Sequence, residues 1–525
     1  MTDPRPNIIL ILADDMGFSD IGCYGSEIET PHLDQLGANG IRFTQAYNCA
    51  RCCPTRASLL TGVYPHQAGV GHMVNNRGLV PYQGYLRSDC VTIGEALGAG
   101  GYRTMLSGKW HVGGIYSRND PSNWAIGDPE RPLPPDRGFD DWYGTPAGAG
   151  SYFNPRPLMR NYTLIEPEDD NYYYTDAVSD QAADMIGRAA QDNRPLFLHV
   201  SYTAPHWPLH AFEEDIAKYQ TQYTQGWDVL RTSRHEELKG LNILDKKWEI
   251  SPRDEKAPDW ADVEAQRWED RRMAVYAAQV DRMDQGIGRI MGKLRELGIE
   301  QNTLVLFMSD NGGCAELLHE DGHQRSREWP TTLDGRDVRF GNVPNLMPGG
   351  AATYQSYDLP WANASNTPFR LYKHWVHEGG ISTPLIAHWP ETIAQSSINH
   401  APIHVVDMMA TFLDIAGVSY PTEYGEHEIQ PLEGESFASA LRGENWQRDR
   451  PIFWEHEGNR AVRQGRWKLV SKYPGDWELY DMVEDRTELN NLADVNEPQV
   501  KKMVSAYQEW AQRCGVVPWA ELTAR

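Results

Sequence analysis

The feature that most constrains the fold is a set of four short segments that are typical of strands, each followed within a few residues by charged or polar residues. The segments cover residues 8–13, 102–106, 196–202 and 303–308. Short runs rich in β-branched and other apolar residues are typical of strands that are buried on both faces of a parallel sheet. The pattern therefore predicts an α/β fold built on such a sheet.

The residues that follow these segments suit catalysis or metal binding. In open parallel sheets, ligands bind beyond the carboxyl ends of the strands, so we expect these side chains to lie close together. Taken singly, each one could be a structural or solvated residue. Together they describe a metal site beside an anion pocket, and they are Asp14 and Asp15, Lys109 and His111, His206, and Asp310 and Asn311.

Two adjacent carboxylates, Asp14 and Asp15, directly follow the first segment. Carboxylates beside a buried strand are costly unless they are neutralised. A hard divalent cation neutralises them readily, because it prefers oxygen ligands. A solvated turn is the alternative interpretation.

A helix start lies in the segment from Cys49 to Gly62. Pro54 suits the first turn of a helix, and Gly62 suits its left-handed end. Cys52 then lies at the helix N-terminus, where anions are favoured, and Arg56 lies on the same side four residues later. We interpret Cys52 as a nucleophile placed where an anionic substrate docks.

Two other interpretations of these cysteines stay open. One is a helix start that happens to carry thiols. The other is a redox or zinc pair formed by Cys49 and Cys52, although the sequence offers no second pair of that spacing for a four-thiolate zinc site. The seven cysteines are too few for a disulfide framework in a chain of 525 residues.

The charge balance excludes some partners. The chain has 49 Lys and Arg against 73 Asp and Glu, which gives a formal net charge of −24. Such a surface repels nucleic acids and anionic membranes, so an anionic substrate needs a locally basic pocket. No apolar stretch approaches the roughly 20 residues of a membrane span, and the N-terminus does not resemble a secretory leader. As the sequence stands, we expect a cytoplasmic protein.

Two parts of the chain are expected, with a boundary at residues 445 and 446. Residues 1–445 form the larger α/β part, which includes a long helix over residues 263–297. Residues 446–525 change to short strands and a final helix, which indicates a small antiparallel α+β subdomain. We expect loops over residues 120–174 and 335–364, and the roles of His72, His377 and the polar insertion 221–258 stay open.

The sequence Cys52-Cys53-Pro54-Thr55-Arg56, followed by Leu60-Thr61-Gly62, resembles the signature of the sulfatase family. Further motifs occur in the order typical of that family, and the whole chain is similar to bacterial arylsulfatases of the alkaline-phosphatase superfamily. The resemblance implies a large central mixed, mostly parallel sheet flanked by helices. The further motifs are Ala-Asp14-Asp15, Gly-Lys109-Trp-His111, Ala-Pro-His206, Ser-Asp310-Asn311-Gly and Lys373 before Glu-Gly-Gly-Ile.

By this resemblance, Cys52 is oxidised after translation to formylglycine, whose hydrated aldehyde is the nucleophile. One Ca²⁺ is implied, with ligands Asp14, Asp15, Asp310, Asn311 and an oxygen of the modified Cys52. Arg56, Lys109 and Lys373 are implied to hold the sulfate, together with His206. Asp310 helps to deprotonate the nucleophile, His206 protonates the leaving group, and His111 takes the proton that releases sulfate.

The implied activity is hydrolysis of small sulfate esters, most often aryl sulfates. Hydrolysis of phosphate diesters or phosphonate monoesters is the nearest alternative, carbohydrate sulfates are another, and a non-catalytic anion- or metal-binding protein is an alternative from a different class. The chemistry requires a formylglycine-generating or sulfatase-maturing enzyme as a partner. The sequence does not decide between a monomer and a homo-oligomer.

Overall fold

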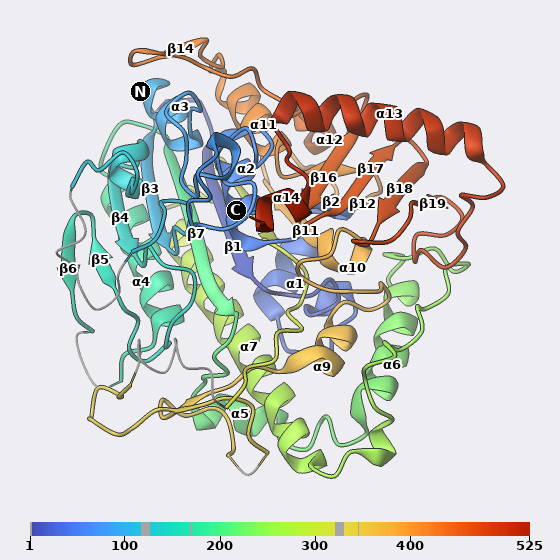
Figure 1. The fold of residues 1–525 in the computed structure, drawn as a ribbon. Helices are drawn as coiled ribbons and strands as arrows, with labels where there is room; N and C mark the ends of the chain where they lie inside the picture. The colour runs from blue at the N-terminus through green and yellow to red at the C-terminus, as the bar shows by residue number, and fades with distance from the viewer. Residues whose placement is uncertain (1–2, 117–125, 168–170, 321–329, 345, 525) are drawn as a thin grey trace.

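The structure is a computed structural model that describes residues 3–116, 126–167, 171–320, 330–344 and 346–524. Within these ranges an 11-stranded sheet forms the centre of the molecule (Figure 1). Its strands are β1 (Asn7–Asp14), β2 (Ile41–Tyr47), β3 (Arg103–Gly108), β4 (Asp141–Gly144), β5 (Leu158–Arg160), β6 (Thr163–Ile165), β7 (Leu196–Pro205), β8 (Thr303–Ser309), β11 (Ser382–His388), β12 (Ser397–Asn399) and β13 (Ile403–His404).

The sheet is mixed and mostly parallel, as expected. Its order is β12-β2-β11-β8-β1-β7-β3-β4-β5-β6, and β13 also pairs with β2. The central strands β8, β1, β7, β3 and β4 are parallel. Antiparallel pairing occurs where β11 joins β2 and β8, and along β4, β5 and β6.

Helices cover both faces of this sheet. Alternate residues of β1 explain the two layers, because successive side chains of a strand point to opposite faces. Ile9 and Ile11 pack in one core with α1, α4 and α7, whereas Leu10 and Leu12 pack in the other with α2, α3 and α11. These helices are α1 (Pro31–Ala38), α2 (Cys52–Thr61), α3 (Ile93–Ala99), α4 (Tyr174–Ala189), α7 (Gln266–Glu296) and α11 (Asp407–Ala416).

A separate small sheet lies near the C-terminus. It consists of β16 (Ile452–His456), β17 (Asn459–Gln464), β18 (Trp467–Ser471) and β19 (Glu478–Asp481), all antiparallel. Helix α13 (Glu497–Cys514) packs on one side through Trp510. On the other side, Trp454 packs with Tyr47 and Ile381 of the larger part. The antiparallel subdomain is confirmed, while its boundary at residue 446 stays a prediction.

Two predicted loops contain regular structure. Strands β4, β5 and β6 lie within residues 120–174, of which residues 120–125 and 168–170 fall outside the described ranges. Strands of three or four residues are too short to show a period in the sequence. Within residues 335–364, of which residue 345 falls outside the described ranges, the structure has β9 (Arg339–Phe340), β10 (Thr353–Tyr354) and most of α9 (Asp358–Ser365).

The polar insertion 221–258 packs against the body of the protein. It contains α6 (Gly226–Gly240), whose Trp227 is buried and whose Arg234 forms ion pairs with Asp20 and Glu27. The remaining α-helices and strands of the described ranges are α5 (Glu213–Tyr219), α10 (Glu378–Ile381), α12 (Ala438–Leu441), α14 (Trp519–Thr523), β14 (Glu423–Tyr424) and β15 (His427–Glu428). No helix in the described ranges combines the length and apolarity needed to cross a bilayer.

Candidate active site

The carboxyl ends of β1, β3, β7 and β8 place the predicted residues together. The pairing brings Asp14 beside Pro205, Ala13 beside Ser309, and Gly108 beside Ser201. The residues that follow in each strand therefore meet at one edge of the sheet. This arrangement brings Asp14, Asp15, Lys109, His111, His206, Asp310 and Asn311 into one buried region, which Lys373 joins from the segment before α10.

Three carboxylates and one amide form an oxygen-rich cluster. Asn311 Nδ2 donates to Asp15 Oδ1 at 2.7 Å, and the Asp15 N–H contacts Asp310 Oδ1 at 3.4 Å. Burial raises the pKa of Asp14 to about 7, and the neighbouring Asp310 adds to this shift. Within the described residues, Asp14 Oδ1 and Asn311 Oδ1 are buried without hydrogen-bond partners. Two such oxygens beside carboxylates suit a hard cation such as Ca²⁺.

Each carboxylate also contacts a buried cationic side chain. Lys109 Nζ hydrogen-bonds Asp14, and Lys373 Nζ lies 2.9 Å from Asp15 Oδ2. Arg56 Nη2 lies 2.7 Å from Asp310 Oδ2 and 3.7 Å from Asp14 Oδ2. Burial alone would lower the pKa of Lys373, but the negative charges around it, Asp15 first and Glu316 among them, together outweigh burial and raise the pKa. These pairs hold the carboxylates in fixed positions.

Cys52 is the first residue of α2, as the sequence predicted. It is 2% exposed, and the pKa of its thiol is lowered well below the usual value. The main cause is a hydrogen bond with Cys53, and His111 and Lys109 add to it against the opposing effect of burial. Residue 52 thus lies where negative charge is stabilised.

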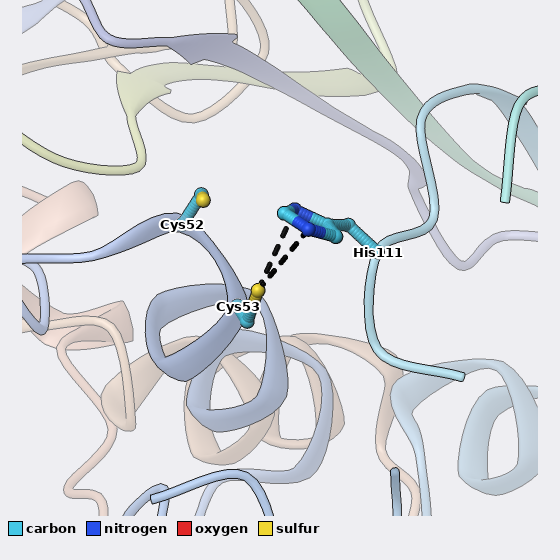
Figure 2. A group of neighbouring side chains, drawn as sticks. All are labelled: Cys52, Cys53 and His111. Carbon is cyan, nitrogen blue, oxygen red and sulfur yellow. Dashed lines mark hydrogen bonds between the residues drawn. The ribbon is translucent and has the colours of Figure 1, made fainter. Parts of the chain in front are cut away.

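His111 lies over the start of this helix. Its Nε2 is 3.3 Å from Cys53 Sγ, and its Nδ1 is 3.5 Å from the same sulfur. Figure 2 shows the ring turned toward Cys52 and Cys53 from a neighbouring segment. Burial lowers the pKa of His111 to about 4, so the ring is neutral at physiological pH and can accept a proton.

His206 is held in one orientation. Its Nδ1 lies 2.6 Å from the backbone oxygen of Trp207, and because that oxygen only accepts, Nδ1 carries the proton. Tyr152 Oη donates to the His206 carbonyl at 2.7 Å, so this aromatic residue packs behind the site. Nε2 then faces Asp15 Oδ2 at 3.3 Å and Lys373 Nζ at 3.4 Å. This nitrogen can exchange a proton with a bound group.

A cavity of about 250 Å³ opens onto these groups. Cys52, His111, His206 and Lys373 are among its lining residues, whereas Arg56 lies beneath it against Asp310. Lys109 likewise contacts Asp14 and is 1% exposed. The predicted residues thus fall into two groups. Cys52, His111, His206 and Lys373 line the cavity, whereas Arg56 and Lys109 lie against the carboxylates.

Sequence reasoning missed two charged residues of the cavity wall. Arg51 precedes Cys52 and forms an ion pair with Glu316, with Nη2 2.9 Å from Oε1. The position of Arg51 beside the predicted nucleophile Cys52 was a usable signal. Glu316 lies in a segment after Asn311 that carries no comparable pattern. Of the residues left without a role, His377 lies 3.6 Å from Glu478, away from the cavity wall.

The whole chain is similar to known proteins of one kind. It matches the sulfatase family model over residues 6–418 and the model of the N-sulphoglucosamine sulphohydrolase C-terminal region over residues 369–513. An uncharacterized sulfatase of Schizosaccharomyces pombe is 30% identical, over 98% of this chain and 94% of that protein. An arylsulfatase of Klebsiella aerogenes is also 30% identical, over 83% of this chain and 92% of that protein.

Solved structures agree with this result. The structure of Ps i-CgsB in complex with k-i-k-neocarrahexaose has 26% sequence identity and a TM-score of 0.66, and the match covers 97% of this chain and 93% of that one. The match to the family model extends over the strand ends and the Cys52 helix described above. The family model, the relatives and the residues at the strand ends all agree. The chain belongs to the sulfatase family of the alkaline-phosphatase superfamily and is a sulfuric ester hydrolase.

Proposed function

We propose that this sulfatase hydrolyses small aryl sulfate esters, using a formylglycine derived from Cys52 and a bound Ca²⁺. The cavity is the observation that carries the choice of substrate. Its volume of about 250 Å³ is below the roughly 300–1,000 Å³ of typical ligand pockets, which favours a small ester. Its lining includes Met73, Ile115, Trp207 and Tyr354, which offer apolar contacts to an aromatic ring.

The surroundings of residue 52 support the proposed nucleophile. A formylglycine there would supply a hydrated aldehyde, one hydroxyl of which attacks sulfur. After the hydrogen bond with Cys53, the charge of Lys109 helps to lower the pKa of the Cys52 thiol, and the same charge would favour a deprotonated oxygen at that place. Asp310 is fixed by Arg56 in the same buried region, which supports its role in accepting that proton.

The cation would be held by Asp14, Asp15, Asp310 and Asn311, with an oxygen of residue 52. It would supply positive charge toward the sulfate oxygens. Lys373 lines the cavity and supports direct binding of sulfate. Arg56 and Lys109 stay predictions as sulfate ligands, because their contacts with Asp310 and Asp14 support a role in holding the carboxylates.

The two histidines suit opposite proton transfers. His206 presents Nε2 to the cavity and, when both ring nitrogens carry a proton, would protonate the leaving phenol from Nε2 while Nδ1 keeps its hydrogen bond to Trp207. His111 is neutral above a pKa of about 4 and would take the proton from the second hydroxyl of residue 52. Maturation requires a formylglycine-generating or sulfatase-maturing enzyme in the host.

A carbohydrate sulfate is the second candidate substrate. A cavity of about 350 Å³ adjoins the catalytic one, and the two share Tyr354 as a lining residue. Phe153, Asn154 and Arg336 line this second cavity and offer stacking and polar contacts. The complex of Ps i-CgsB with neocarrahexaose also favours this alternative.

The test compares several esters on one enzyme preparation. We expect kcat/KM for an aryl sulfate to exceed that for the matched aryl phosphodiester and for a sulfated oligosaccharide by at least about tenfold, which is 1.4 kcal/mol of transition-state binding. The Cys52→Ala variant, purified in the same way, controls for contaminating hydrolases. Faster phosphodiester turnover would overturn the proposed reaction, and faster oligosaccharide turnover would select the second candidate.

A further inference from the structure

A second cluster of metal-binding side chains lies outside the active site. It joins the segment after α2, the residue following Lys373, and the turn between β16 and β17. Its members are His72, His374, His456 and Glu457, and none of them lines the catalytic cavity as described.

One carboxylate is the centre of this cluster. Glu457 Oε2 lies 2.8 Å from His374 Nδ1, and Glu457 Oε1 lies 2.7 Å from His72 Nε2 and 3.7 Å from His456 Nε2. One ligand atom each of His374, His456 and Glu457 lies within 4.8 Å of the other two. Two imidazoles and a carboxylate that converge on one position are a common ligand set for zinc.

The buried ring of His456 is the second observation. His456 is 0% exposed, and in the part of the chain that the structure describes neither of its ring nitrogens has a hydrogen-bond partner. Buried polar atoms are rarely left without a partner, because the lost hydration costs about 1–3 kcal/mol. A metal ion would satisfy one of these nitrogens.

The backbone and the surroundings also fit a ligand site. His374 and Glu457 have positive φ angles of 90° and 51°, a strained conformation that often occurs at ligand clamps. The side chains of His374 and Glu457 are 26% and 23% exposed, which leaves access for an ion. The ring of Trp519 packs against the ring of His72, with the ring centroids 5.1 Å apart.

We propose that His374, His456 and Glu457 bind a second metal ion of the transition series, such as Zn²⁺, while His72 orients the carboxylate of Glu457. Imidazole and carboxylate ligands suit Zn²⁺, whereas Ca²⁺ prefers all-oxygen sites, so the two ions would use separate places. A hydrogen bond from a second histidine to a ligating carboxylate is a common supporting contact. The ion would connect the catalytic part to the C-terminal sheet beside Lys373.

The experiment measures Zn²⁺ binding with the other candidate sites silenced. Cys52, Cys53 and His111 also lie close enough to hold a metal, so every protein carries Cys52→Ser and Cys53→Ser. Excess Ca²⁺ fills the oxygen-rich site. Zn²⁺ affinity is then measured by competition with a chromophoric chelator, and thermal unfolding is followed with and without Zn²⁺.

We expect this background protein to bind one Zn²⁺ per chain and to gain thermal stability from it. Adding His456→Asn should weaken Zn²⁺ binding at least about 100-fold and abolish the gain. His427→Asn, at an exposed histidine of β15, is the matched control and should bind as the background does.

Glu457→Gln is the second test variant, because His456 is buried and its replacement can impair folding. Gln keeps the size of the side chain but removes its charge, so Zn²⁺ affinity should fall at least about tenfold. The proposal is overturned if the background protein binds no Zn²⁺, or if Glu457→Gln and any folded His456→Asn protein bind it as tightly as the background. In either case the cluster is a set of hydrogen-bonded ion pairs.

Discussion

At the scale of residues, the site is a layer of ion pairs beneath a reactive cavity. Asp14, Asp15 and Asp310 each contact a different cation, and all are buried. Such charges are stable in a protein interior only when they are paired or bind a metal. The cavity-facing residues can therefore act on substrate while the layer below fixes their positions.

His206 gives a sharp prediction about leaving groups. Its Nε2 faces the cavity, so His206→Gln removes the proposed acid while the side chain stays polar. A phenol that leaves easily needs little protonation, whereas a poorer leaving group depends on it. We expect kcat to fall about 10²–10⁴-fold for an unactivated sulfate ester and much less for nitrophenyl sulfate, as measured by steady-state kinetics. An equal fall for both esters would contradict the assigned role.

At the scale of elements, the sequence predicts the central strands but misses short ones. Runs such as residues 8–13 and 303–308 are apolar, except for Thr303, because both faces of the sheet are covered by helices. Strand β6 (Thr163–Ile165) has three residues on the edge of the sheet and no such pattern. Helix α9 was missed because its register is set by packing, with Trp361 fully buried.

The active site likewise contains residues that the sequence could predict and residues that it could not. Asp14, Lys109 and Asp310 were predictable because each lies at the end of a strand or directly after it, so strand order alone brings them together. The pair of Arg51 with Glu316 was not predictable, because it joins a helix start to an irregular segment 265 residues later. Contacts made by loops depend on the folded path of the chain, which local sequence patterns do not encode.

The end of β3 is the element on which Lys109 and His111 depend. Gly108 has φ of +120°, and a Cβ there would lie 1.9 Å from the Ser201 backbone oxygen of β7. We expect Gly108→Ala to lower the free energy of unfolding by at least about 2 kcal/mol and to reduce turnover, because the strand end must move. Urea denaturation and kinetic assays measure the two effects.

Gly292→Ala is the matched control for this substitution. Gly292 lies in α7, and among the described residues no atom beyond its chain neighbours and the nearby backbone of its own helix lies within 4 Å of the added Cβ. Alanine there should raise the free energy of unfolding by about 0.5–1 kcal/mol and leave activity unchanged. Equal stability of the Gly108→Ala protein and the wild type would show that β3 and β7 tolerate separation at this point.

At the scale of the whole molecule, buried charges join the C-terminal subdomain to α10 of the larger part. Lys468 of β18 lies 2.8 Å from both Glu378 and Glu488, and Arg486 Nε lies 3.1 Å from Glu378. All four side chains are fully buried. Removing one partner of a buried ion pair leaves an uncompensated charge, which is strongly destabilising. Glu378 of this network directly precedes Gly379 and Gly380, the glycines that follow Lys373 in the sequence.

Glu378→Gln tests this junction. We expect the free energy of unfolding to fall by about 3 kcal/mol in urea denaturation. Glu497→Gln, in the exposed pair with Lys501, should change it little. A similar effect of both substitutions would show that the buried network does not stabilise the junction.

The network also predicts a pH dependence. Burial alone would raise the pKa of Glu378, but Lys468 and Arg486 outweigh it and lower the pKa to about 2. A lowered carboxyl pKa stabilises the folded state above its ordinary value of 4.5. This contribution should therefore be lost as pH falls from 4.5 toward 2, and the difference between wild type and Glu378→Gln should shrink over that range. A difference that stays constant would contradict the account.

The most direct test of the central claim is mass spectrometry of the peptide that contains Cys52, run beside turnover of an aryl sulfate. The account predicts that Cys52 is present as the aldehyde and that turnover rises in proportion to its occupancy across preparations. Cys52→Ala should fold but lose roughly 10⁴-fold or more in turnover, as expected when a nucleophile is removed. A Cys52 that remains a thiol in fully active protein would contradict the account, because the proposed nucleophile would then be absent.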